Sequence, residues 1–383
     1  MSDDETIRQT APTRRDAIKY GTALVGSGLV AGCVGDGSTG TPDNGTPNTD
    51  EGHSVTMEPV GTVEFDAVPE EWLAYTGDYA DMGVALGQAD GLEAIGVRAR
   101  FGTHYYEELP GVAVDDAELT QLWNDGTDKE VFYELDPDVN VVDPNFMVNR
   151  LGVSEGDVEE IRDNVAPLVG NTGFTRVYDW HDDYRYYTLY EAFEKMAELF
   201  DEQGRYEAFV ELHDEVLGDV EDRLPAESPD IAVLYPAGVP PESFYPYLVG
   251  EGSQSKQFRD LDVGDALAAN GVTDAQVDGG TIDFETLLDI DPDALAVRLQ
   301  GEITDAYFDR EIRSHLEDHD VASELTAVQE GRVFYSGLTY QGPIIQLFQL
   351  ERAARGIYPE EFAAADDELF DRQRVADIVN GDV

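Results

Sequence analysis

The sequence predicts an α/β protein with two lobes, each built on a parallel sheet, that are joined by one long interlobe helix. Short runs rich in Val and Ile alternate with segments of helical period, which favours parallel sheets. One 20-residue segment has the pattern of an unbroken amphipathic helix, and a nine-residue pattern occurs once on each side of it. The chain of 383 residues, 42% of them hydrophobic, is long enough for two domains that each bury a core.

Residues 1–33 have the pattern of a lipoprotein export signal. Arg14 and Arg15 precede a Gly-rich apolar run over Gly21–Val30 that is too short to span a bilayer, and the arginine pair is typical of twin-arginine export. Cys33 follows a Val-Ala-Gly lipobox sequence and, as the only cysteine, has no disulfide partner. We therefore expect Cys33 to carry a lipid, followed by a flexible tether over residues 34–54 that is rich in Gly, Thr, Pro and Asn.

Six short apolar runs, which we expect to be strands, outline the two lobes. Those at Thr62–Phe65, Gly91–Val97 and Val139–Val142 fall in an N-terminal lobe over residues 55–203, and those at Asp230–Tyr235, Ala294–Leu299 and Gly331–Tyr335 fall in a C-terminal lobe over residues 226–362. Segments such as Pro69–Gly77 and Glu351–Tyr358 are predicted to be helical and lie between them. Residues 363–383 form a tail for which the sequence predicts no role.

The interlobe helix is predicted over residues 204–225. Apolar residues recur at helical spacing from Tyr206 to Leu224, acids occupy the other face, and Pro225 ends the segment. About 20 residues at 1.5 Å each give roughly 30 Å, which is enough to cross from one lobe to the other. Thr188–Gln203 is predicted to be the helix that precedes it.

The charge of the chain excludes one class of partner. It has 81 acids and 24 Lys plus Arg, a formal net charge of −57, so no basic face is available to bind nucleic acid. Acids spread evenly through foldable segments, with lysine nearly absent, resemble the proteins of halophilic archaea. At ~1 M salt the Debye length falls to roughly 3 Å, so the self-repulsion of these charges is largely screened.

A repeated pattern lies on both sides of the long helix. E-V-F-Y-E-L-D-P-D begins at Glu130, and E-T-L-L-D-I-D-P-D begins at Glu285. One interpretation is structural, because Asp-Pro-Asp is a good helix stop and glutamate in a first turn is favoured by the helix dipole. The other interpretation is that each lobe presents a carboxylate to a partner.

This arrangement resembles the class III substrate-binding proteins of ABC importers, which serve ferric siderophores, cobalamin and haem. The resemblance covers about Val60–Phe362 and is carried by the two lobes, the linking helix, the tether and both copies of the repeat. It implies a periplasmic-binding-protein fold, held as a lipid-anchored monomer on the extracellular face of the membrane. It also implies that Glu130 and Glu285 form salt bridges with the permease, which works with its ATPase. The expected cargo is a ferric siderophore-type complex, with cobalamin or haem as alternatives, and the protein needs no cofactor and is no enzyme.

The ligand site is expected in the loops that follow the carboxyl ends of the strands. These loops are rich in arginine, whose planar fork suits chelate oxygens, and in aromatic residues, whose faces suit a bulky, partly apolar ligand. The candidate ligand-binding residues are Arg98, Arg100, Tyr105, Trp180, Tyr184, Arg185, Tyr235, Tyr245, Arg298 and Tyr340.

Other chemistry has weaker support in the sequence. His315 and His319 lie one helical turn apart, as metal ligands can, but they lack the HExxH order. The acidic segment Asp179–Asp183 would suit a hard cation, or a secreted lipoprotein hydrolase that uses Asp182 or Asp183. Because no phosphate loop, Ser-His-Asp order or cysteine nucleophile is present, we expect neither a metal site nor catalysis, and the hydrolase is kept as the alternative.

Overall fold

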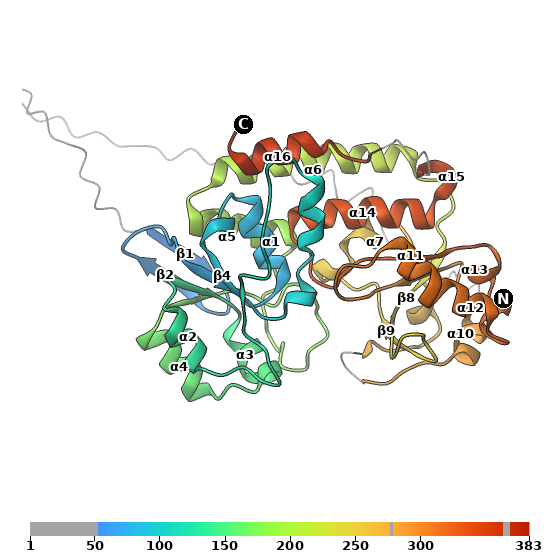
Figure 1. The fold of residues 1–383 in the computed structure, drawn as a ribbon, viewed down its shortest axis with the longest axis horizontal. Coiled ribbons are helices and arrows are strands. Elements are labelled where there is room, and N and C mark those ends of the chain that lie inside the picture. The colour runs from blue at the N-terminus through green and yellow to red at the C-terminus, as the bar shows by residue number, and fades with distance from the viewer. Residues whose placement is uncertain (1–52, 276–278, 363–367, 383) are drawn as a thin grey trace, which may run out of the picture. The chain divides into compact units, whose positions relative to one another are not determined.

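Two five-stranded sheets follow one another along the chain, and helices flank them (Figure 1). The structure is a computed structural model that describes residues 53–275, 279–362 and 368–382. The predicted export signal, Cys33 and nearly all of the predicted tether therefore lie outside the described residues. We call each sheet with its flanking helices a lobe.

The sheet of the N-terminal lobe has the strand order β5-β4-β3-β6-β7, and every neighbouring pair is parallel. Its strands are β3 (Trp72–Ala74), β4 (Leu92–Ile95), β5 (Thr120–Gln121), β6 (Val139–Val141) and β7 (Leu168–Val169). The helices of this lobe are α1 (Gly77–Ala85), α2 (Glu130–Leu135), α3 (Pro144–Leu151) and α4 (Glu155–Asn164). β3 and β6 are buried along their whole length, as expected for parallel strands that are covered on both faces.

The sheet of the C-terminal lobe has the parallel order β10-β8-β11-β12, and β9 pairs antiparallel with β8. Its strands are β8 (Asp230–Pro236), β9 (Phe244–Tyr247), β10 (Gly264–Asp265), β11 (Ala294–Val297) and β12 (Val333–Tyr335). Its helices are α7 (Lys256–Asp260), α8 (Ala266–Ala269), α10 (Phe284–Ile290), α11 (Asp305–Phe308), α12 (Ser314–Asp318), α13 (Thr326–Gln329), α14 (Pro343–Ile357) and α15 (Pro359–Phe362). The predicted α/β fold with two parallel sheets is confirmed.

One predicted strand lies outside the two parallel sheets, and one predicted helix is wrong. Thr62–Phe65 is a strand, but it belongs to β2 (Gly61–Phe65), which pairs antiparallel with β1 (His53–Met57) outside both parallel sheets. Pro69–Gly77, which we predicted to be helical, contains the central strand β3. The apolar residues of that segment are consecutive and fully buried, and a short apolar run does not distinguish a core strand from a buried helix.

The long helix is α6 (Gln203–Arg223), which follows α5 (Leu189–Phe200) (Figure 1). The inner face of α6 buries Phe209, Leu212, His213, Val216 and Val220. The described end of the tail forms α16 (Arg372–Asn380), which packs along α6 and pairs Arg374 with Glu215. No helix in the described ranges, α6 included, is both long and apolar enough to cross a membrane.

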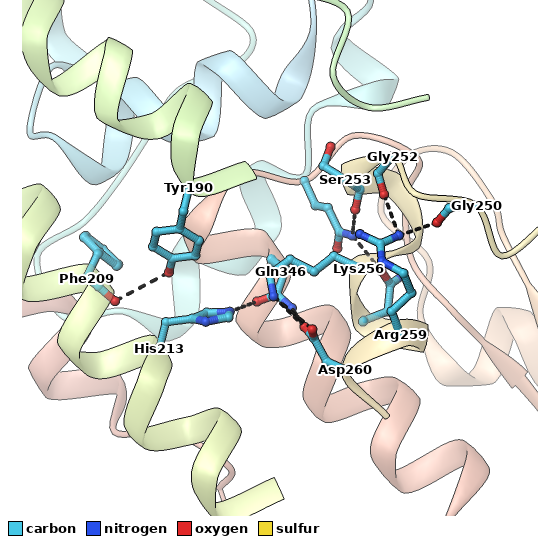
Figure 2. A network of polar contacts seen from close by, with 12 residues as sticks. Tyr190, Phe209, His213, Gly250, Gly252, Ser253, Lys256, Arg259, Asp260 and Gln346 are labelled. Atoms are coloured by element: carbon cyan, nitrogen blue, oxygen red, sulfur yellow. Dashed lines mark hydrogen bonds and ion pairs between the residues drawn. The ribbon is translucent and has the colours of Figure 1, made fainter. Parts of the chain in front are cut away.

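A polar network fastens α6 to the C-terminal lobe (Figure 2). His213 Nε2 on α6 donates to Gln346 Oε1 on α14 at 2.8 Å, and Gln346 Nε2 donates to Asp260 Oδ2 on α7 at 3.0 Å. Lys256 Nζ also lies 2.8 Å from Asp260 Oδ2. Burial lowers the pKa of His213 to about 3, so its imidazole stays neutral at physiological pH.

A buried carboxylate joins the two lobes on the side of α1. Asp81 of α1 is fully buried, and its Oδ2 accepts the first backbone N–H groups of α14, from Ile344 at 3.0 Å and Ile345 at 2.9 Å. Its Oδ1 accepts the Tyr106 hydroxyl at 2.7 Å. Because this carboxylate lies at the positive end of a helix of the other lobe, it fixes where α14 begins.

These two buried groups should give the free energy of unfolding opposite dependences on pH. Burial raises the pKa of Asp81 from 3.8 to about 7, so its contribution to stability is full below about pH 4 and is lost as pH rises through 7. The pKa of His213 is lowered from 6.5, so its contribution is full above about pH 6.5 and is lost as pH falls toward 3. Ionisation of Asp81 should therefore lower the free energy of unfolding of the wild type by on the order of 4 kcal/mol between pH 4 and pH 8, and Asp81→Asn should remove this decrease.

Urea unfolding of the wild type, Asp81→Asn and His213→Gln between pH 4 and pH 8 measures both effects. The many exposed acids titrate alike in all three proteins, so the difference from the wild type isolates each group. An Asp81→Asn profile parallel to that of the wild type over this range would contradict the assignment.

Candidate ligand-binding site

A cavity of about 450 Å³ lies between the lobes, where the loops after several parallel strands meet. Residues of both lobes line it: Arg100, Phe146, Arg150, Phe174 and Tyr178 from the N-terminal lobe, and Tyr235, Tyr245, Tyr247, Ala275, Gly279, Gln300, Thr339 and Tyr340 from the C-terminal lobe. No acidic side chain of the described residues is among them. This is the position at which α/β proteins bind small molecules.

Four of the predicted ligand-binding residues, Arg100, Tyr235, Tyr245 and Tyr340, line this cavity. Burial raises the pKa of Tyr235 and Tyr340, so their hydroxyl groups stay protonated at neutral pH and can donate hydrogen bonds. Arg100 is exposed at the cavity, and its charge acts on both tyrosines. The cavity therefore presents hydrogen-bond donors and a guanidinium group.

Three predicted residues in the segment before α5 are not among the lining residues. Trp180 stacks on the lining residue Tyr178, with 5.1 Å between ring centroids and 14° between ring planes. The Tyr184 hydroxyl donates to Asp143 Oδ2 at 2.5 Å, inside the N-terminal lobe. Arg185 lies over the ring of its neighbour Tyr187 at 4.5 Å.

The other three predicted residues are not among the lining residues either. Tyr105 is buried and stacks on Phe348, with 5.1 Å between centroids. Arg298 is 1% exposed and lies against the lining residue Tyr247. Arg98 lies two residues before Arg100, and its backbone N–H donates to Gln121 Oε1 at 3.2 Å.

Sequence reasoning missed the lining residues Tyr247 and Arg150, and only Tyr247 had a signal in the sequence. Tyr247 lies two residues after Tyr245 in β9, and residues two apart in a strand share a face, so alternation predicts both. Arg150 lies in the last turn of α3, where position relative to the strand end gives no signal. Only the fold of α3 brings its side chain to the cavity.

Several arginines, among them Arg100 and Arg150 of the lining, differ from the others because they form no ion pair with a described carboxylate. Within the described ranges Arg98, Arg100, Arg150, Arg176, Arg185 and Arg298 form no ion pair. Elsewhere arginines such as Arg205, Arg313 and Arg372 are paired with acids. In a chain with 81 acids and 24 Lys plus Arg, such unpaired cations give the cavity region a local positive charge.

The two copies of the repeat fold alike. α2 begins at Glu130, and Glu285 is the second residue of α10. Each helix ends at an aspartate in the left-handed conformation, Asp136 with φ 50° and Asp291 with φ 46°. In both lobes the pattern is therefore a short helix, a turn and a parallel strand.

The last aspartate of each copy has a structural role. Asp138 Oδ2 accepts the backbone N–H of Glu70 and Glu71 at 2.9 and 3.0 Å, and Asp293 Oδ2 accepts that of Asp230 at 2.8 Å. These bonds tie β6 to the start of β3 and β11 to the start of β8, so the structural interpretation explains Asp-Pro-Asp. Glu130 and Glu285 each lie in the first turn of a helix, where the helix dipole favours an acid, and both are exposed on the surface, where a partner could reach them.

The two histidines considered as metal ligands have other partners. His315 Nε2 donates to the carbonyl of Pro241 at 2.9 Å, and His319 Nδ1 accepts the backbone N–H groups of Val321 and Ala322 at 3.2 Å. His319 therefore caps the short helical turn that follows it. Across the described residues, no group of three or more His, Cys, Asp or Glu side chains is placed to hold a metal ion.

Comparison with known proteins gives the family. The model of the periplasmic binding protein family matches residues 73–337. Similar solved structures include the siderophore-binding protein BauB bound to ferric iron and two acinetobactin molecules (16% identity, TM-score 0.56, covering 80% of this chain and 99% of that chain). The petrobactin-binding protein YclQ of Bacillus subtilis has 15% identity, a TM-score of 0.56 and the same coverage. The heme-binding protein HmuT has 16% identity and a TM-score of 0.55, and the match covers 86% of this chain and 96% of that chain.

At these identities the solved structures establish the fold alone, and no curated protein sequence matches the chain. The family match, however, spans both sheets from β3 to β12, together with α6 and all the described lining residues of the interlobe cavity except Thr339 and Tyr340. The chain therefore belongs to the periplasmic binding protein family.

Proposed function

We propose that this protein captures a ferric siderophore-type iron complex outside the cytoplasm and delivers it to an ABC permease and its ATPase, without catalysing a reaction. The observation that carries the proposal is the interlobe cavity, which is lined by aromatic residues and two arginines and by no described acid. In so acidic a chain, this lining favours a bulky, partly apolar and anionic ligand. A ferric chelate with catecholate or carboxylate groups fits this description.

Haem is the second candidate. The cavity presents several tyrosine hydroxyl groups, and tyrosine is one of the residues that ligate haem iron in proteins. One of the similar solved structures is a heme-binding protein. Cobalamin has no comparable feature in its favour.

The proposal includes the membrane anchor. Export through the arginine pair and lipidation of Cys33 would place the body on the extracellular face of the membrane, held by the tether as a monomer. The acidic surface then suits a brine environment, in which charge repulsion is screened at short range.

Quenching of tryptophan fluorescence tests the proposal. The full chain with Cys33→Ser, in multimolar KCl, is titrated with ferric hydroxamates, ferric catecholates, haem, cobalamin and free Fe³⁺. We expect tight quenching by one ferric chelate and not by its iron-free form, because Trp180 stacks on the lining residue Tyr178. Trp180→Phe should remove most of the quenching and leave the affinity, measured by calorimetry, unchanged.

Quenching by haem alone would make haem the cargo. Absence of a response to every compound would exclude the iron-complex assignment and turn attention to the hydrolase alternative.

A further inference from the structure

Arg298 is a guanidinium group buried behind the wall of the cavity. It follows β11, is 1% exposed and does not line the cavity. Its Nη2 donates to the carbonyl of Gln254 at 2.5 Å, and its Nη1 lies 3.5 Å from Gln254 Oε1. Its Nε is buried and has no hydrogen-bond partner among the described residues.

The charge of Arg298 has no contacting counter-ion. No carboxylate of the described residues forms an ion pair with it, although the buried Asp274 acts on it electrostatically. The rings of Tyr247 and Phe258 lie against the guanidinium, at 5.3 and 6.0 Å from their centroids. Burial lowers the pKa of Arg298 to about 10, so it is charged at neutral pH. A buried charge without a touching partner is costly, and the fold nevertheless keeps one here.

Tyr247 connects this charge to the cavity. Its side chain contacts Arg298 and also lines the cavity together with Tyr245 and Gln300. A ligand that rests on Tyr247 would lie within about 10 Å of the guanidinium, with protein rather than water between them, where charges interact more strongly than in solvent. Salt screens this buried charge less than it screens the exposed Arg100 and Arg150.

We propose that an anionic ligand supplies the missing counter-ion of Arg298. Arg298 itself sets the charge preference of the cavity from behind Tyr247, without touching the ligand. This inference rests on the proposed function. Arg100 and Arg150 would make the direct contacts, whereas Arg298 is a specificity-determining residue whose effect persists at high salt.

A purely structural role for Arg298 predicts a different result. Arg298 donates to the carbonyl of Gln254. The backbone N–H of Gln254 in turn donates to the carbonyl of the lining residue Phe174 at 3.2 Å, and this hydrogen bond joins the two lobes. Loss of this support would loosen the wall and weaken all ligands alike. A charge effect instead changes the ratio of affinities between anionic and neutral ligands.

The experiment compares two ferric complexes of similar size, a hexadentate tris-catecholate that carries three negative charges and a hexadentate tris-hydroxamate that is neutral. Arg298→Gln keeps a donor for Gln254 and removes the charge, whereas Arg298→Lys keeps both. In the full chain with Cys33→Ser, Arg298→Gln should weaken the catecholate complex about tenfold and the hydroxamate complex less than twofold. Arg298→Lys should restore most of the selectivity.

Titrations at low and at multimolar KCl complete the test. The loss of selectivity in Arg298→Gln should persist in multimolar KCl, whereas the effect of Arg100→Gln should shrink. Equal weakening of both complexes, no change in their ratio, or a wild type that prefers the neutral complex would each overturn the inference. A wild type that binds neither complex would instead overturn the proposed function, and the inference with it.

Discussion

Replacing both Arg100 and Arg150 with Gln should weaken binding of the preferred ferric chelate by about 100- to 1,000-fold. The two side chains reach the cavity from different elements of the N-terminal lobe, the loop after β4 and the end of α3, and neither has an acidic partner among the described residues. Their guanidinium groups are therefore available to the oxygens of an anionic ligand. Each single variant should weaken binding at least about tenfold.

Arg162→Gln combined with Arg310→Gln is the matched control, because it removes the same two charges from exposed arginines that are paired with Asp163 and Glu311. Calorimetric titration of the wild type, the double variant and this control measures the effect, and thermal unfolding without ligand checks that the variants fold. If the double variant binds within threefold of the wild type, the two arginines do not contact the ligand.

Replacing both Glu130 and Glu285 with Ala should abolish uptake of the iron complex by cells and leave ligand binding unchanged. Both glutamates lie in the first turn of short helices that occupy equivalent places in the two lobes. Each is exposed, and neither lines the cavity. A permease with two similar subunits would need one carboxylate from each lobe, and electrostatic complementarity of this kind governs docking more than ligand affinity.

Glu159→Ala combined with Glu317→Ala is the matched control, since it removes two exposed glutamates from α4 and α12 and changes the net charge equally. Uptake of labelled iron complex by cells that express each protein, together with titration of the purified proteins, separates transport from binding. Normal uptake by the variant that lacks Glu130 and Glu285 would exclude the docking role.

The pattern of the sequence was sufficient for the architecture. Runs such as Ala294–Leu299 are short, branched and apolar, and they recur between helical segments, which only an α/β arrangement accommodates. The long helix was predictable because its apolar stripe is uninterrupted over six turns or so of chain. The repeat was informative because Pro imposes the same local geometry in both copies, and both strands begin directly after it.

The cavity was predictable only at the level of loops. Sequence position places Arg100 and Tyr340 after strands, and both line the cavity. It places Arg298 at the end of a strand and Trp180 in the segment that leads into the long helices, yet neither lines the cavity: Trp180 stacks on Tyr178, and Arg298 lies against Tyr247. The difference lies in which neighbours each side chain packs against, and those neighbours come from distant parts of the chain.

By itself, the sequence determined the period of each element, the places where helices stop and the acidic character of the surface, because these depend on residues close together in the chain. Only the tertiary structure decided which side chains meet between the lobes. Asp81 reaches α14 across 263 positions of sequence, and Arg150 reaches Tyr178 because two separate segments fold against each other. Contacts of this kind depend on the packing of whole elements, which no local pattern encodes.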